Sequence, residues 1–138
     1  MEEKIRVIKC EVGKKAKEKI INSDLKSLQQ EVGGYIEPLY LKENICIICD
    51  EEGKVRQKPL NRAIRGDDDK IEEIIAGDFF ICGLDEEGDF RSLNDEEINE
   101  YLRVFKLPEE ILILNNEIIA VPYEPMQRVN SYENEKCL

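Results

Sequence analysis

The apolar residues of this chain occur in short runs of strand length that are bounded by turn-forming residues. Short apolar runs of this kind are typical of strands, and continuous ones of strands buried on both faces. We predict strands over the following ranges: 5–12, 16–21, 35–41, 44–50 and 79–84. No run approaches the roughly 20 residues of a membrane-spanning helix. We therefore expect a folded domain with a β-sheet core and no membrane partner.

Capping signals predict two to three helices between these strands. Asn22 or Ser23 can begin a helix that carries Leu25, Leu28 and Val32 on one face, and Gly33-Gly34 ends it. A Pro at a first helical position and a Gly after the last predict a short helix over 59–65. The spacing of Asn94 and Glu97 is that of a capping box, which begins a helix that reaches residue 105. A closing hairpin is predicted over 111–121.

This order of elements predicts a small single α+β domain with a mixed or antiparallel sheet. Its first five elements, ββαββ, are similar to a β-grasp arrangement. At 138 residues the chain fits one domain, which we place at 1–124. Residues 125–138 are polar and lack periodicity, so we expect a C-terminal tail there.

Charge is distributed unevenly along the chain. Residues 1–65 hold 14 basic and 11 acidic residues, a net charge of +3, whereas residues 66–138 hold 6 and 20, a net charge of −14. The total of −11 disfavours direct nucleic-acid binding, which needs a basic surface. We expect the first half to suit an anion and the second half a basic protein. The sequence is also compatible with a homo-oligomer.

The residue types exclude several kinds of chemistry. The chain has no His, so Ser-His-Asp triads and His-bearing zinc sites cannot form. Cys46 and Cys49 have CxxC spacing, but within a strand they point to opposite faces, so we expect core thiols and no metal. Five cysteines without a secretory signal pattern indicate a reducing cytoplasm. We identify no catalytic residue and no cofactor, and expect a binding protein rather than an enzyme.

The most pointed feature is the cationic segment 56–65, which holds four cations and no acid. Its cations could pair with an anion, Asn61 could recognise a polar group, and Tyr35 could stack on a ring. The candidate ligand-binding residues are Tyr35, Arg56, Lys58, Asn61, Arg62 and Arg65. The alternative is that Arg62 forms a structural ion pair and Asn61 stabilises the preceding turn. On the first interpretation Arg62→Ala removes binding and leaves the fold intact, and on the second it destabilises the fold.

Several motifs follow one another in an order found in a known family. They are Gly33–Glu37, Asp50–Lys54, Pro59–Arg62, Ile74–Ile81 and Ser92-Leu93. Over residues 4–122 the chain resembles the family of small phage and mobile-element proteins catalogued as domain of unknown function 3846. The resemblance carries no residue role. It implies a phage or mobile-element accessory protein that works in the bacterial cytoplasm.

Taken together, the cationic segment and the resemblance favour one functional hypothesis. We expect a protein that counters host defence by binding and sequestering an anionic small molecule, a nucleotide immune signal. The alternative is an acidic inhibitor that uses residues 67–100 to block a basic surface of a host defence or nucleic-acid-binding protein.

Overall fold

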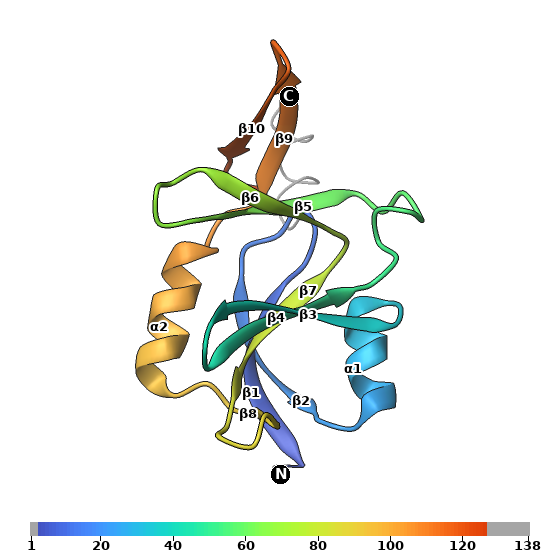
Figure 1. Ribbon diagram of the computed structural model, residues 1–138, viewed down its shortest axis with the longest axis vertical. Coiled ribbons are helices and arrows are strands. Elements are labelled where there is room, and N and C mark those ends of the chain that lie inside the picture. The colour runs from blue at the N-terminus through green and yellow to red at the C-terminus, as the bar shows by residue number, and fades with distance from the viewer. Residues whose placement is uncertain (1–2, 127–138) are drawn as a thin grey trace, which may run out of the picture.

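The computed structural model describes residues 3–126 and consists mainly of β-strands (Figure 1). Ten strands and two short helices follow one another in this part of the chain. The elements are β1 Lys4–Cys10, β2 Lys17–Asn22, α1 Leu25–Val32, β3 Ile36–Lys42, β4 Ile45–Asp50, β5 Leu60–Arg65, β6 Ile71–Ala76, β7 Phe79–Leu84, β8 Phe90–Arg91, α2 Asp95–Val104, β9 Glu109–Leu114 and β10 Glu117–Pro122.

The main sheet has the strand order β2-β1-β7-β4-β3, and the short β8 pairs with β7. Every pairing in it is antiparallel. Every residue of β4 and β7 is buried, which agrees with the continuous apolar runs that predicted these two strands. Two further sheets have two strands each, β5-β6 and β10-β9.

The main sheet separates two apolar clusters. On one face α1 packs through Leu28 and Val32 against Cys46 and Ile48. On the other face α2 and the β5-β6 sheet pack against the remaining side chains of β4 and β7. Figure 1 shows the two helices on opposite sides of the sheet. A sheet covered on both faces explains why its central strands carry so few polar residues.

Local capping sets the ends of both helices. Asn94 and Glu97 form the predicted capping box at the start of α2, with both hydrogen bonds present. At α1 the predicted cap is wrong by one or two residues, because Asp24 accepts the hydrogen bond from the Ser27 backbone. Gly33 ends α1 in the left-handed conformation, as the Gly pair predicts.

The predicted fold class is wrong. The structure is a mostly β protein with ten strands in three sheets and two short helices, not an α+β domain with a β-grasp-like ββαββ start and two to three helices. The two hairpins of the predicted start do not pair with each other, because β7 lies between β1 and β4 and pairs antiparallel with both.

The segment 59–65 accounts for much of this error. It forms strand β5 in place of the predicted helix, and β5 pairs with β6. Pro59 lies just before the strand and does not begin a helix. The helix predicted over 59–65 therefore does not exist.

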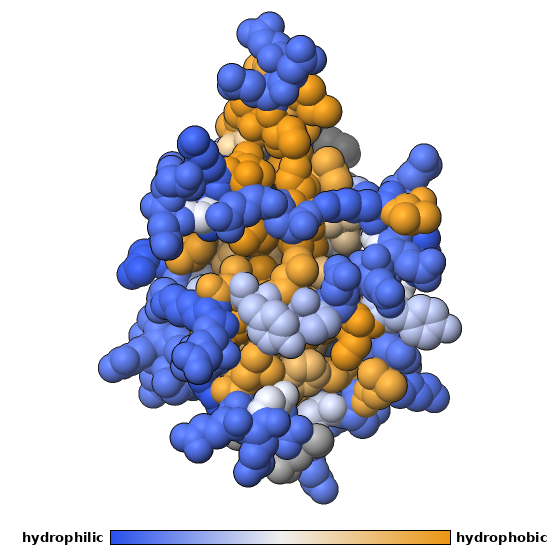
Figure 2. Space-filling model, viewed as in Figure 1, coloured by the Kyte–Doolittle hydropathy of each residue, from blue (hydrophilic) through white to orange (hydrophobic). Residues whose placement is uncertain are grey.

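The predicted closing hairpin is confirmed as β9-β10, with Asn115 and Asn116 at positive φ in its two-residue turn. It projects from the rest of the molecule (Figure 1), and apolar side chains cover much of it in Figure 2. Its most exposed apolar residues are Ile113, Leu114 and Ile118.

Within residues 3–126, neither helix is long and apolar enough to cross a membrane. Most of the predicted tail, residues 127–138, lies outside the described residues.

Candidate functional site

The six residues predicted to contact a ligand do not form one site. Tyr35 and Arg56 line a surface hollow, and Lys58 forms an ion pair with the buried Asp50 directly behind it. Asn61 and Arg62 are buried, and Arg65 forms an ion pair in another part of the molecule. Only Tyr35 and Arg56 are brought together at the surface.

Asn61 and Arg62 are each only 1% exposed. The Asn61 amide donates to the carbonyl oxygens of Cys10 and Gly77, both at 2.9 Å. Its own oxygen accepts from Arg62 Nη1 at 2.6 Å. The rest of the guanidinium donates to the carbonyl oxygens of Phe105, at 3.0 and 3.1 Å, and Lys14, at 2.8 Å.

This buried pair links segments that are distant in sequence: β1, the turn after it, the end of α2 and the β6-β7 turn. Burial lowers the pKa of Arg62, and backbone dipoles take the place of a counter-ion. Among the described residues no carboxylate forms an ion pair with Arg62. Arg62 is therefore neither exposed to a ligand nor part of an ion pair, which are the two roles that the sequence suggested. Its guanidinium instead donates to main-chain carbonyl oxygens of separate segments.

Lys58 belongs to a site centred on Asp50, whose side chain is fully buried. Lys58 Nζ lies 2.6 Å from Asp50 Oδ2 and also donates to the carbonyl oxygens of Val32 and Gly33 at the end of α1. The Asp50 carboxylate accepts from the Glu52 backbone as well. The lysine thus ties the C-terminus of α1 to the end of β4 and offers little to a ligand.

The charge state of Asp50 follows from these contacts. Burial raises its pKa, but the hydrogen bonds from Lys58 and the Glu52 backbone and the positive charge of Arg56 lower it more, so the pKa lies below its usual value. A Cβ at Gly34 would collide with the carboxylate, so the close approach requires glycine there. Sequence reasoning assigned Asp50 no role. The sequence feature that could have indicated such a role is an acid at the end of an apolar strand, shortly before several cations.

The surface hollow lies beside this buried site, between α1 and the β4-β5 loop. Its volume is about 290 Å³, and it is lined by Lys26, Gln29, Gln30, Gly34, Tyr35 and Arg56. The Tyr35 residue is 64% exposed. The Arg56 side chain is about half exposed; its Nη1 lies 3.4 Å from Asp50 Oδ2 and donates to the Gly33 carbonyl at 3.3 Å. An aromatic face, two cations and two amides thus meet at one open surface.

Arg65 does not line this hollow and makes its contacts in another part of the molecule. Its Nη1 is 3.2 Å from a carboxylate oxygen of Glu109, and its Nη2 donates to the Ala120 carbonyl at 3.3 Å. Glu109 also accepts from the Ala63 backbone. Arg65 therefore fixes the base of hairpin β9-β10 to β5.

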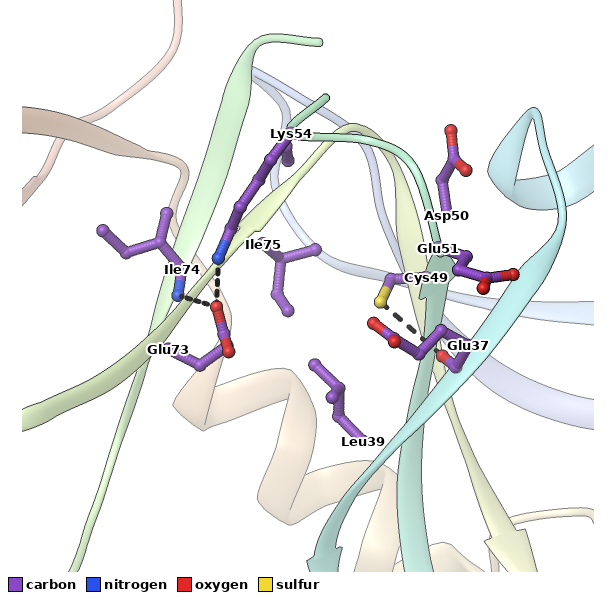
Figure 3. A pocket seen from close by; sticks show the side chains of 10 residues that line it. Glu37, Leu39, Cys49, Asp50, Glu51, Lys54, Glu73, Ile74 and Ile75 are labelled. Atoms are coloured by element: carbon purple, nitrogen blue, oxygen red, sulfur yellow. Dashed lines mark hydrogen bonds and ion pairs between the residues drawn. The ribbon is translucent and has the colours of Figure 1, made fainter. Parts of the chain in front are cut away.

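A second hollow next to Asp50 is too small for a nucleotide. Its volume is about 90 Å³, and it lies between β3, β4 and β6 (Figure 3). Lys54 contacts Glu73 across it, and the Cys49 thiol donates to the Glu37 carbonyl at 3.6 Å. The polar groups at its edge are therefore largely paired with one another.

The CxxC cysteines lie on opposite faces of β4, as strand geometry predicts. Cys46 packs with the α1-side cluster and Cys49 with the α2-side cluster. Cys46 Sγ lies 3.6 Å from Cys82 Sγ on β7. Burial raises the pKa of Cys10 and Cys49 to about 12, which keeps both as unreactive thiols.

We expect the folded protein to protect its described cysteines from thiol reagents. All four are buried, and only Cys137 lies outside the described residues. With Ellman's reagent at about pH 8, below the ordinary thiol pKa of about 8.5, no more than one thiol per chain should react quickly. All five should react in denaturant. Rapid reaction of two or more thiols in the folded protein would contradict this burial.

The acidic loop after β7 brings three carboxylates, those of Asp85, Glu87 and Asp89, within 4.8 Å of one another. Asp85 Oδ1 accepts from the backbone nitrogens of Glu87 and Asp89, both at 2.9 Å. The first carboxylate thus stabilises a turn, which is an ordinary role for aspartate.

Comparison with known proteins gives a family and no activity. No curated protein and no solved structure matches the chain. One family model, whose description is "Domain of unknown function (DUF3846)", matches residues 5–106. The match includes the Asp50 site, the buried Asn61–Arg62 pair and the surface hollow, and it ends before β9. Because it covers most of the sequence, the chain belongs to the DUF3846 family.

Proposed function

We propose that this protein is a binding protein that holds an anionic, ring-bearing small molecule of the nucleotide class in the hollow beside α1. The observation that carries the proposal is the exposed Tyr35 ring next to the half-exposed Arg56 guanidinium. Aromatic side chains stack on nucleobases, and arginine pairs with phosphate through two parallel hydrogen bonds. The hollow, at about 290 Å³, has the size of a small-molecule site.

Each group around the hollow has a role in this proposal. Tyr35 stacks on the ring, Arg56 and Lys26 pair with phosphate oxygens, and Gln29 and Gln30 hydrogen-bond to edge groups of the ring or sugar. Asp50, which pairs with Lys58, lies behind the hollow and holds Arg56 close to it through an ion pair. Without a histidine in the chain, a general base would have to be a carboxylate, and sequestration is the simpler use of the site.

The biological setting is part of the same proposal. The family resemblance favours a phage or mobile-element protein in the bacterial cytoplasm, where a sequestered nucleotide immune signal no longer activates its receptor. A protein with this role needs high affinity and abundance, not turnover.

Two substitutions test the hollow. We expect Tyr35→Ala and Arg56→Ala each to weaken nucleotide binding roughly tenfold or more, since base–aromatic stacking contributes about 1–3 kcal/mol. Isothermal titration against a panel of linear and cyclic nucleotides measures the affinity. The melting temperature should change little, because Tyr35 is exposed and the ion pair of the half-exposed Arg56 is weak.

Matched controls come from the same chain. Tyr40→Ala removes an equally exposed tyrosine from β3, and Arg103→Ala an exposed arginine from α2; neither should alter binding. The proposal is wrong if no nucleotide gives heat, or if both hollow variants bind like the unmodified protein. Chromatography after long incubation separates sequestration, which returns the ligand intact, from an enzyme, which yields product.

A second candidate function is the acidic inhibitor. The observation that favours it is the exposure of acids in the β5-β6 loop and the first turn of α2, namely Asp67, Asp68, Asp69, Asp95 and Glu96. Asp95 pairs with Arg6, and the other exposed acids attract a basic partner such as the nucleic-acid groove of a defence protein. A pull-down from host lysate tests it, with capture expected to fall steeply as salt rises; a complex insensitive to salt would count against it.

A further inference from the structure

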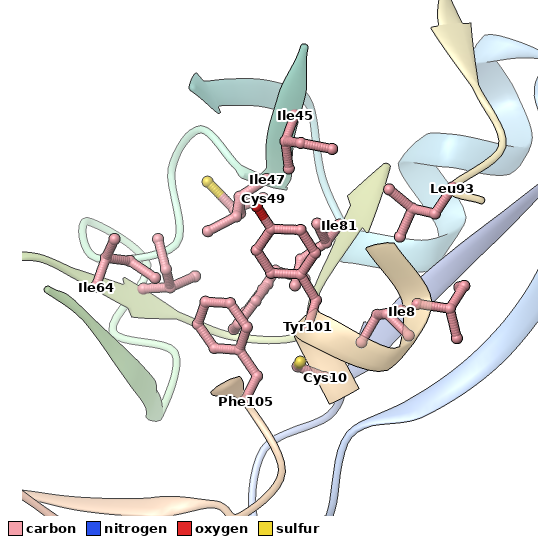
Figure 4. Close-up of a cluster of buried hydrophobic side chains, with 13 residues drawn as sticks. Ile8, Cys10, Ile45, Ile47, Cys49, Ile64, Ile81, Leu93, Tyr101 and Phe105 are labelled. Atoms are coloured by element: carbon pink, nitrogen blue, oxygen red, sulfur yellow. The ribbon is translucent and has the colours of Figure 1, made fainter. Parts of the chain in front are cut away.

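A larger cleft lies on the other side of the molecule, between α2, the end of β3 and the β5-β6 sheet. Its volume is about 520 Å³. Apolar side chains form much of its wall: Leu41, Ile64, Val104 and Phe105. Figure 4 shows Tyr101 of α2 and Phe105, which directly follows this helix, in the apolar cluster that also contains Ile64 of β5. None of these residues lines the hollow beside α1.

Tyr101 lines this cleft and carries an unsatisfied polar group. The residue is 4% exposed, and no hydrogen bond of ordinary geometry reaches its hydroxyl within residues 3–126, although the Lys42 ammonium lies near enough to interact with it. A buried hydroxyl without a partner is uncommon in folded proteins and calls for an explanation. In Figure 4 the hydroxyl lies at the end of the ring that points away from α2.

Lys42 is the side chain that covers this tyrosine. Its ammonium lies 6.0 Å from the ring centroid and 3.3 Å from a carboxylate oxygen of Glu100. The Lys42 side chain is 57% exposed, so its ion pair contributes little to stability and it can move aside at small cost. Movement of the Lys42 side chain would give a ligand access to the Tyr101 ring and its hydroxyl.

The charges at the rim define the ligand. The pairs Lys42–Glu100 and Arg65–Glu109 each cancel in charge. Asp67, Asp69 and the buried Arg62 also line the cleft, so its three cations and four carboxylates leave a net charge of −1, with the two exposed aspartates at its mouth. An anion is therefore disfavoured here, in contrast to the hollow beside α1.

We propose that this cleft is a second binding site, which takes a neutral and mostly apolar small molecule with one hydrogen-bonding group for the Tyr101 hydroxyl. The apolar body replaces water against Ile64, Val104 and Phe105, and the polar group satisfies the buried hydroxyl. The site does not depend on the nucleotide-binding proposal.

Benzamide and benzoate are suitable probes, because they share a ring and a size but differ in charge. In a titration followed by amide NMR, we expect benzamide to shift the signals of residues around Ile64, Tyr101 and Val104, and benzoate to bind more weakly. Tyr101→Phe should weaken benzamide roughly three- to tenfold, the range expected for one hydrogen bond. Its melting temperature should be unchanged or higher, because the hydroxyl has no hydrogen bond of ordinary geometry to lose.

A blocking variant makes the test independent of Tyr101. Val104 is exposed on α2, so Val104→Trp should fill the cleft, abolish benzamide binding and preserve the fold. Val55→Trp, in the exposed β4-β5 loop, is the control and should bind benzamide normally. The proposal is overturned if benzamide shifts no cleft residue, if Tyr101→Phe binds as tightly as the unmodified protein, or if benzoate binds equally well.

Discussion

Arg62→Ala should lower the free energy of unfolding by about 4 kcal/mol or more, which is a large part of the 5–15 kcal/mol that stabilises an ordinary domain. Truncation strands two buried acceptors, the carbonyl oxygen of Phe105 and the side-chain oxygen of Asn61, and also removes the donor to the part-buried carbonyl oxygen of Lys14. Each unsatisfied buried acceptor costs about 1–3 kcal/mol. The cavity left by the fully buried side chain adds to this loss. Urea unfolding at neutral pH measures the change.

Arg56→Ala is the control, because it removes an arginine that is only six residues away but half exposed. We expect it to change the unfolding free energy by less than about 1 kcal/mol. The stability of Arg62→Lys should be closer to that of Arg62→Ala than to that of the unmodified protein. One ammonium group cannot replace the several N–H donors of the guanidinium, which reach three separate oxygens. An Arg62→Ala variant with an unchanged unfolding midpoint would refute the structural role.

The strands predicted over 5–12, 16–21, 35–41, 44–50 and 79–84 are confirmed as β1, β2, β3, β4 and β7. The clearest of them are those whose sequence alone determines their environment. β4 and β7 are continuous apolar runs, and such runs have few alternatives to the interior of a sheet. Their neighbours in the sheet could not be predicted in the same way. The position of β7 between β1 and β4 depends on pairing between segments more than 30 residues apart, about which local patterns say nothing.

β5 shows why polar residues mislead a prediction from sequence. Asn61 and Arg62 occupy interior positions of this strand, where apolar residues are expected. They are tolerated because carbonyl groups from separate parts of the chain converge on them. The polar residues that made this segment a candidate anion site are therefore buried, and they connect separate parts of the chain.

The candidate site was predictable only in part. Tyr35 and Arg56 were identified from their residue types, because an aromatic ring and a guanidinium suit a nucleotide wherever they are exposed. Their partners Lys26, Gln29 and Gln30 come from α1, and no spacing rule connects that helix to the β4-β5 loop. Tyr101 gave no signal either, because a tyrosine on the apolar face of a helix is ordinarily a core residue.

The second large effect is expected at Asp50. Asp50→Asn keeps the shape of the side chain but removes its charge, which leaves Lys58 beside a neutral group at the end of α1. Hydrogen bonds to charged groups contribute about 1.5–3 kcal/mol, so we expect a loss of about 2–3 kcal/mol in the free energy of unfolding at neutral pH. Glu110→Gln, which alters an exposed carboxylate on β9, should have no measurable effect.

The dependence on pH distinguishes a charged Asp50 from a merely well-packed one. Its pKa is lowered in the folded protein relative to the value of about 3.9 expected when unfolded. An acid whose pKa is lower in the folded than in the unfolded protein stabilises the fold fully at pH values above its unfolded pKa. This stabilisation is lost as the pH falls through the pKa of the folded protein. Urea unfolding between about pH 7 and pH 2 should therefore show a shallower loss of stability for Asp50→Asn than for the unmodified protein. Because Glu31, Glu73 and Glu97 also have lowered pKa values, the variant should still lose some stability in acid. Parallel curves for the two proteins would show that Asp50 does not act through its charge.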